Sequence, residues 1–110
     1  MARRSFPRQD NTMSTVKWLP EALTDIERLH TFLLTKSPEA GVKAAEIILQ
    51  GAIQLRTMPR IGRPMPDGTG RRELFMAFGA GAYVIRYLQL DENTVLVLRV
   101  WHSRETRDLN

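Results

Sequence analysis

The feature that most constrains this chain is a pair of strand-like runs near its C-terminus, in residues 82–107. The runs read "AYVIRYLQL" and "TVLVLRVWHSRETR", and only the residues "DEN" separate them. Two runs rich in β-branched and aromatic residues around a short polar turn predict a β-hairpin. His102 and Arg104 lie at the end of the second run, which places a titratable ring and a permanent cation where the chain leaves the sheet.

The turn also sets which residues of the hairpin face each other. If Leu90 pairs with Thr94, the other pairs follow, namely Tyr83 with Trp101, Ile85 with Arg99 and Arg86 with Leu98. One face is then an apolar wall, formed by Val84, Leu88, Leu96, Leu98 and Val100. Such a wall needs a cover supplied by another part of the chain.

The cover is predicted to be a pair of helices. From Pro20 to about Lys36, apolar residues recur at helical spacing, in the set Ala22, Leu23, Ile26, Leu29, Phe32 and Leu33. A second helix should begin after Ser37, because its hydroxyl can cap the helix and Pro38 suits the first turn. That helix should stop before Pro59, since proline disrupts a helix interior. The linker is very short, so the two helices are expected to form a hairpin.

The remaining segments complete a small α+β domain. "STVKWL" predicts a short strand and "RRELFMAF" a longer one, whereas residues 59–70 contain three prolines and three glycines and predict a loop. We therefore expect an antiparallel sheet, a short N-terminal strand plus a three-stranded C-terminal meander, packed on an N-terminal helical hairpin. Residues 1–12 have no periodic apolar pattern and are expected to be a flexible tail, with residues 13–110 as a single domain.

Composition excludes several classes of function. The chain has no cysteine, and its two isolated histidines, His30 and His102, are too few for a zinc site. We therefore expect no metal and no cofactor. No apolar run approaches the roughly 20 residues that cross a bilayer, and the N-terminus lacks the apolar core of a secretory signal. A cytoplasmic protein that does not contact the membrane is expected.

The charge distribution points to an anionic partner. The formal net charge is +4, and 13 of the 16 cations are arginine, whose guanidinium suits bidentate contacts with phosphate or carboxylate. A coding preference for arginine would give the same count. Position is more informative, because residues 17–55 hold four cations and five acids, whereas residues 56–72 hold five arginines and one acid, Asp67. The partner of this basic segment can be nucleic acid or an acidic protein segment.

The order strand, helix, helix, strand, strand, strand resembles the RelE/ParE family of toxins from type II toxin–antitoxin systems. Six segments carry the resemblance within residues 16–107: "LPEALTDIERLHTFL", "SPEAGVKAAEIILQGAIQL", "PRIGRP", "RREL", "YVIRYL" and "TVLVLRVWHSRE". The resemblance implies the α+β fold expected above and one of two activities. RelE-type members are ribosome-dependent endonucleases that cut messenger RNA, whereas ParE-type members poison DNA gyrase.

The residues at the expected site favour the ParE-type activity. In a nuclease, the resemblance would make His102 and Arg104 catalytic, as the acid or base and as a phosphate ligand. RNA cleavage needs a base, an acid and at least one positioned cation. The second strand of the sheet runs "LFMAF" where such nucleases carry further lysine or arginine, and no tyrosine follows Trp101. The ending "LRVWHSRE" also looks more like the ParE type, so a gyrase inhibitor is preferred and the mRNA endonuclease is the alternative.

The resemblance also implies a cognate antitoxin whose C-terminal segment wraps the toxin in a hetero-oligomer. The expected antitoxin contacts are Arg86, Arg99 and Trp101. The expected contacts with the target or with phosphate are Arg60, Arg63, Arg71, Arg72, Arg86 and Arg104. An exposed sheet edge, an apolar groove and arginines would suit such a partner. The second partner is DNA gyrase, or the ribosome with its mRNA in the alternative.

Structural roles compete with these functional ones. His102 can simply hydrogen-bond nearby backbone at the end of its strand. Arg86 and Arg99 can pair with acids, Glu73 among them, because an unpaired charge within an apolar strand is costly. A nucleic-acid-binding module without toxicity is a third hypothesis, and the modest net charge of +4 makes it weaker than the toxin readings.

Overall fold

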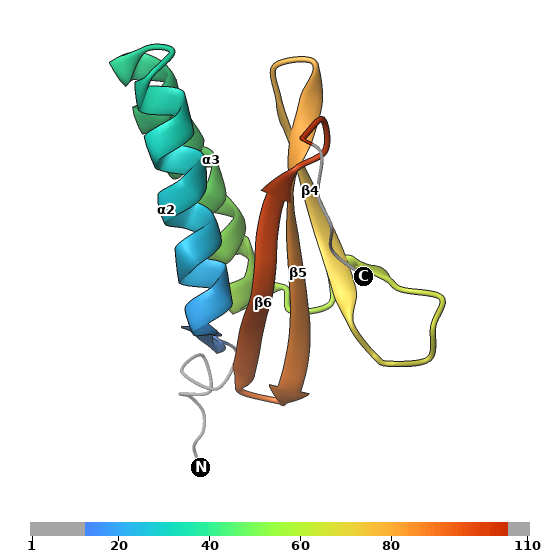
Figure 1. The fold of residues 1–110 in the computed structure, drawn as a ribbon. Helices are drawn as coiled ribbons and strands as arrows, with labels where there is room; N and C mark the ends of the chain where they lie inside the picture. The colour runs from blue at the N-terminus through green and yellow to red at the C-terminus, as the bar shows by residue number, and fades with distance from the viewer. Residues whose placement is uncertain (1–12, 106–110) are drawn as a thin grey trace.

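The computed structural model describes residues 13–105, and Figure 1 shows two layers, a helical hairpin beside a sheet. Its elements are β2 (Thr15–Trp18), α2 (Pro20–Leu34), α3 (Pro38–Thr57), β3 (Arg63–Pro64), β4 (Arg72–Phe78), β5 (Gly81–Asp91) and β6 (Thr94–His102). The predicted tail at residues 1–12 lies outside the described residues, as do residues 106–110. No helix within residues 13–105 is long and apolar enough to cross a membrane.

Both helices begin where local chemistry predicts. Pro20 occupies the first turn of α2, and the Ser37 hydroxyl accepts a hydrogen bond of 3.0 Å from the Ala40 amide at the start of α3. α3 ends at Thr57, ahead of the proline at position 59. α2 ends at Leu34, two residues earlier than its apolar period predicts, so the helical hairpin is confirmed with a slightly shorter first arm.

The sheet has the strand order β2-β6-β5-β4-β3. β4, β5 and β6 form the predicted antiparallel meander, whereas β2 runs parallel to β6. The expectation of a wholly antiparallel sheet is therefore wrong for its N-terminal strand. Parallel pairing needs a long connection between the two strands, and the helical hairpin and the strands after it supply that connection between β2 and β6. The predicted loop at residues 59–70 also contributes a two-residue strand, β3, which pairs with the start of β4. The α+β class itself is confirmed.

The predicted register of the β5–β6 hairpin holds only in its middle. Tyr87 pairs with Val97 as expected, but Leu98 is an extra residue without a partner on β5. This bulge shifts every later pair by one, so Tyr83 lies opposite His102 and not opposite Trp101. For the same reason Ile85 faces Val100, and Arg86 faces Arg99. The tip differs too, since Asp91 and not Leu90 pairs with Thr94.

The face of the hairpin that meets the helices is not the predicted one. The inward residues are Tyr83, Ile85, Tyr87, Val95, Val97 and Val100, so only the last of the predicted wall is among them. The number of aliphatic residues on each face does not identify the inward face, because both faces carry buried residues. Val84 and Trp101, for example, are buried but lie outside this cluster. The two inward tyrosines supply large apolar rings, and the Tyr87 hydroxyl accepts a 2.8 Å hydrogen bond from the Gly62 amide.

Gly62 sits where only glycine fits. A Cβ atom there would lie 2.7 Å from the Tyr87 ring and hydroxyl and 3.0 Å from the Glu73 carbonyl oxygen. This close approach holds the chain entering β3 against the core and places Arg63 beside β4.

Candidate functional site

A buried carboxylate joins α2 to β6 at the point where β2 has ended. Asp25 is 2% exposed. Its Oδ2 accepts hydrogen bonds from the Val100 amide at 2.9 Å and from Arg99 Nε at 2.8 Å, while Oδ1 accepts from Arg99 Nη2 at 3.0 Å. Burial alone would raise the pKa of Asp25, but the hydrogen bonds from Arg99 and Val100 and the Arg99 charge outweigh it and hold that pKa below its ordinary value.

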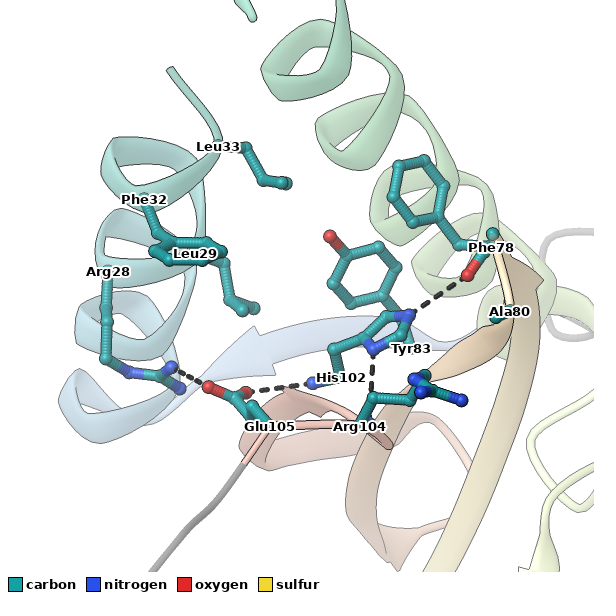
Figure 2. Close-up of a pocket in the computed structure, with 11 residues that line it drawn as sticks. Arg28, Leu29, Phe32, Leu33, Phe78, Ala80, Tyr83, His102, Arg104 and Glu105 are labelled. Atoms are coloured by element: carbon teal, nitrogen blue, oxygen red, sulfur yellow. Dashed lines mark hydrogen bonds and ion pairs between the residues drawn. The ribbon is translucent and has the colours of Figure 1, made fainter. Parts of the chain in front are cut away.

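Arg28, one turn further along α2, ties the C-terminal turn to the helix. Its guanidinium contacts Glu105, and it also lies 3.4 Å from Asp25 and 3.5 Å from the Val100 carbonyl oxygen. Glu105 in turn accepts a 2.9 Å hydrogen bond from the His102 amide. Figure 2 shows the contacts of Glu105 with Arg28 and with the His102 amide along one side of the pocket. We call Asp25, Arg28 and Glu105 the clasp.

His102 uses both ring nitrogens within the protein. Nε2 lies 3.0 Å from the Phe78 carbonyl oxygen, and Nδ1 accepts a 3.2 Å hydrogen bond from the Arg104 amide (Figure 2). This pattern assigns the neutral tautomer with the proton on Nε2, donated to the carbonyl. The ring also packs edge-on against Tyr83, with centroids 4.9 Å apart. The backbone role expected as one reading of His102 is therefore what the structure shows.

An apolar pocket of about 590 Å³ opens between α2 and the turn after β4. Leu29, Phe32 and Leu33 of α2 form one wall, and Phe78 and Tyr83 form the other (Figure 2). The rim is polar and consists of Arg28, His102, Arg104 and Glu105. No carboxylate within residues 13–105 forms an ion pair with Arg104. An apolar cavity with a guanidinium on its rim suits a ligand that has both an apolar body and an acidic group.

The four arginines of the loop region lie at the other end of the sheet and mostly have local partners. Arg71 pairs with Asp67 at 2.9 Å, and Arg72 donates to the carbonyl oxygens of Arg60 and Gly62 at 3.1 and 2.8 Å. Hydrogen bonds from the Thr69 side chain and amide and from Arg71 lower the pKa of Asp67 to about 2. Arg63 lies over the Phe75 ring, 5.0 Å from its centroid.

The two arginines of the hairpin are paired, as the argument from buried charge predicts. Arg86 donates to Glu73 at 2.7 and 3.0 Å, so the proposed Glu73 partner is confirmed. The Arg86 guanidinium also lies 4.8 Å from the centroid of the Trp101 ring, and Trp101 is only 6% exposed. Arg99 pairs with Asp25 instead.

The structure brings together only part of the predicted site. His102 and Arg104 are neighbours on one rim, but the six arginines expected to bind target or phosphate do not form one cluster. β4 separates Arg72 from Phe78 at the pocket by about 20 Å, at roughly 3.3 Å per residue. The clasp was missed. The one signal for it was an aspartate at position 25, within the apolar stripe that contains Ala22 and Leu29.

This arrangement of helices and sheet is found in a solved toxin–antitoxin structure. The structure titled "Chromosomal ParDE TA system from P. aeruginosa" superposes with a TM-score of 0.65, covering 84% of this chain and 97% of that chain. The sequence identity is 20%, so this likeness concerns the fold alone. The class that this likeness defines is therefore a small α+β fold with a helical hairpin against a five-stranded sheet.

The sequence comparisons give the family. The model of the "ParE toxin of type II toxin-antitoxin system, parDE" matches residues 16–107. The chain belongs to this family and is a toxin of a type II toxin–antitoxin system, as its resemblance predicts. Toxin RelE3 of Caulobacter vibrioides is 35% identical over 95 residues, covering 86% of this chain and all of the relative. Toxin RelE1 of the same organism is 35% identical over 86 residues, covering 78% and 89%.

Proposed function

We propose that this toxin arrests growth by binding and poisoning DNA gyrase in the cytoplasm, and that it does so as a docking protein without a catalytic step of its own. The observation that carries the proposal is the state of His102, whose two ring nitrogens both bond to backbone groups. A general acid or base needs a ring nitrogen within reach of the reacting proton. His102 offers neither nitrogen without breaking the turn that it supports.

The cations give the same support. RNA cleavage requires charge stabilisation at the phosphate by cations that converge on one point. Arg86 and Arg99 each form an ion pair with a carboxylate. The arginines of the loop lie at the start of β4, whereas Arg104 lines the pocket beside Phe78 at the end of that strand. The surface therefore resembles a set of separate contact points for an acidic partner more than a phosphate cradle.

An mRNA endonuclease of the RelE type is the second candidate, and one feature of the sheet favours it. On the face away from the helices, Arg63 lies over Phe75 and Arg86 lies over Trp101. Cations interleaved with aromatic rings are a common surface for single-stranded RNA. The curated relatives are also named RelE toxins, although those names state no substrate.

The antitoxin is the third part of the proposal. We propose that its C-terminal segment covers the apolar pocket and places an acid near Arg104, which matches the apolar lining and charged rim. Arg99 remains a predicted contact because its side chain is still 32% exposed beside Asp25, whereas Arg86 is only 13% exposed and would contact the antitoxin over a smaller area. Trp101 is buried, so its predicted role in antitoxin binding would be to hold Arg86 in position.

The test compares two assays on one preparation of purified toxin. The proposal expects inhibition of supercoiling by gyrase, or accumulation of gyrase-cleaved DNA, with both effects removed by the cognate antitoxin. Arg104→Ala is the informative variant and Lys43→Ala its matched control, because Lys43 is an exposed cation of α3 that is not among the predicted contacts. Normal gyrase activity alongside cleavage of ribosome-bound mRNA would reverse the ranking of the two candidates.

A further inference from the structure

The helix α3 carries apolar residues on two sides, and the core uses only one of them. Its buried residues are Gly41, Ala44, Ile48, Gly51, Ala52 and Leu55. Val42, Leu49 and Ile53 are also apolar, but they lie on a different side of the helix and are 56%, 59% and 45% exposed. A surface helix normally directs its apolar residues into a single stripe that faces the core. The second apolar side of α3 therefore indicates a contact with another molecule.

The spacing of this second side is that of a helix that pairs with another helix. Six exposed residues follow one another at alternating intervals of three and four positions, and we call them the α3 stripe: Glu39, Val42, Glu46, Leu49, Ile53 and Arg56. This alternation repeats every seven residues, as in the seam of a two-stranded coiled coil. At 1.5 Å per residue, the stripe is about 26 Å long, which is enough for several layers of contact with a second helix.

The order of charges along the stripe selects the partner. Glu39 begins the stripe and Arg56 ends it, and neither forms an ion pair within residues 13–105. The two residues lie equally far from the midpoint between Glu46 and Leu49. An antiparallel second copy therefore brings Glu39 of each chain to Arg56 of the other. A parallel copy would place Glu39 against Glu39 and Arg56 against Arg56, and like charges oppose that arrangement.

We propose that two copies of this toxin associate through their α3 stripes, packed antiparallel about a twofold axis between Glu46 and Leu49. Val42 of each copy then packs against Ile53 of the other, so the contact is self-complementary and each of its pairs occurs twice. No residue of α3 lines the apolar pocket, so this contact leaves the proposed antitoxin site open.

Glu46 limits the strength of the contact. In the antiparallel pair it lies against Leu49 of the other copy, and the two Glu46 side chains occupy neighbouring layers beside the axis. A polar residue in such a seam lowers the stability of the pair but fixes its register. One helix per copy also buries less than the roughly 1,200 Å² of a standard interface. We therefore expect a weak dimer, with a Kd on the order of 100 µM.

Sedimentation equilibrium of the purified full-length toxin, from about 10 µM to about 1 mM, tests the proposal. The average mass should rise from that of a monomer toward that of a dimer. Leu49→Glu places further carboxylates beside Glu46 and should weaken association by at least about tenfold. Gln54→Glu is the matched control, since it adds the same charge at an exposed position of α3 outside the stripe. Its association should stay within about twofold of that of the parent.

A charge exchange tests the antiparallel orientation. Glu39→Arg and Arg56→Glu each place like charges at both ends of the pair, so each should weaken association by about threefold or more. The double variant restores opposite charges only in the antiparallel pair, where its association should return to within about twofold of that of the parent. The exchange also opposes the dipole of α3, so circular dichroism checks that each variant is folded. Glu46→Gln removes the like charges beside the axis and should tighten the dimer by about threefold.

Three results would overturn the inference. A toxin that remains monomeric at about 1 mM leaves the stripe to a different kind of partner. A dimer that persists in the folded Leu49→Glu variant uses another surface. A double variant that associates no better than the two single variants excludes the antiparallel pairing.

Discussion

The β6 edge and the β4 edge show two ways in which a small sheet can end. At β6, a buried carboxylate from a helix replaces the missing strand and is itself neutralised by Arg99. At β4, the backbone of Phe75 and Ala77 has no such substitute within the described residues, and Arg63 lies over the exposed ring of Phe75. The first edge is therefore part of the folded core, whereas most of the second has no backbone partner within the described residues. This difference places a stabilising hydrogen-bond network on the β6 side of the toxin and leaves most of the β4 edge without one in the described residues.

The largest expected effect on stability comes from removing the buried carboxylate of the clasp, that of Asp25. Asp25→Ala leaves Arg99 without its partner and the Val100 amide without an acceptor, so it should lower the free energy of unfolding by about 3–5 kcal/mol. Urea denaturation followed by circular dichroism measures this. Asp67→Ala is the matched control, because Asp67 pairs with an arginine on the exposed loop, and its midpoint should fall much less than that of Asp25→Ala. Equal losses in the two variants would mean that the clasp is not a buried element.

The same carboxylate should set part of the acid sensitivity. Its pKa is lower in the folded chain than its ordinary value of 3.8, so its contribution is complete above that value and is lost as the pH falls through the lower, folded pKa. The difference in unfolding free energy between the parent and Asp25→Asn should therefore shrink as the pH falls below about 4. Denaturation curves at pH 7, 4 and 3 decide this, and a constant difference would argue against a depressed pKa.

A smaller effect is expected at His102. His102→Phe keeps a ring against Tyr83 but loses the hydrogen bonds to the Phe78 carbonyl and the Arg104 amide, so stability should fall by about 1–2 kcal/mol. Gyrase inhibition by the folded variant should remain within about twofold of the parent, because the proposed mechanism uses no proton transfer. A loss of more than about 100-fold in the variant's toxicity, with its fold intact, would favour a catalytic histidine.

The smallest effect is expected at the exposed end of the clasp. Glu105→Gln removes the charge that Arg28 contacts but keeps an oxygen for the His102 amide. Partly exposed ion pairs contribute little, so the change in unfolding free energy should stay below about 1 kcal/mol. A thermal melt against the parent measures it. A much larger loss would show that the clasp acts as a single unit from Asp25 to Glu105.

Local chemistry made most of the fold predictable. The helix starts at Pro20 and Pro38 depend on neighbouring residues, and the order of elements follows from apolar periodicity. The register failed at Leu98 because a bulge leaves no mark in an alternating apolar run. The inward face was predicted wrongly because two of its largest residues, Tyr83 and Tyr87, carry hydroxyl groups and are less apolar than the valine and leucine residues of the predicted face.

The site was less predictable than the fold, for a spatial reason. Arg60, Arg63, Arg71, Arg72 and Arg104 look similar in the sequence, but a seven-residue strand places them at opposite ends of the sheet. Glu73 was predicted to pair with one of Arg86 and Arg99, and it pairs with Arg86, which lies opposite it on the neighbouring strand. The partner of Arg99 was missed, because Asp25 is 74 residues away in sequence and no local pattern connects them.

The most direct test of the account follows the order of events in living cells. Expression of the toxin without its antitoxin, with labelled thymidine and labelled methionine added together, shows which synthesis stops first. A docking inhibitor of gyrase predicts that DNA synthesis stops while protein synthesis continues. Protein synthesis that stops first, while DNA synthesis persists, would contradict the account and make the toxin an mRNA endonuclease.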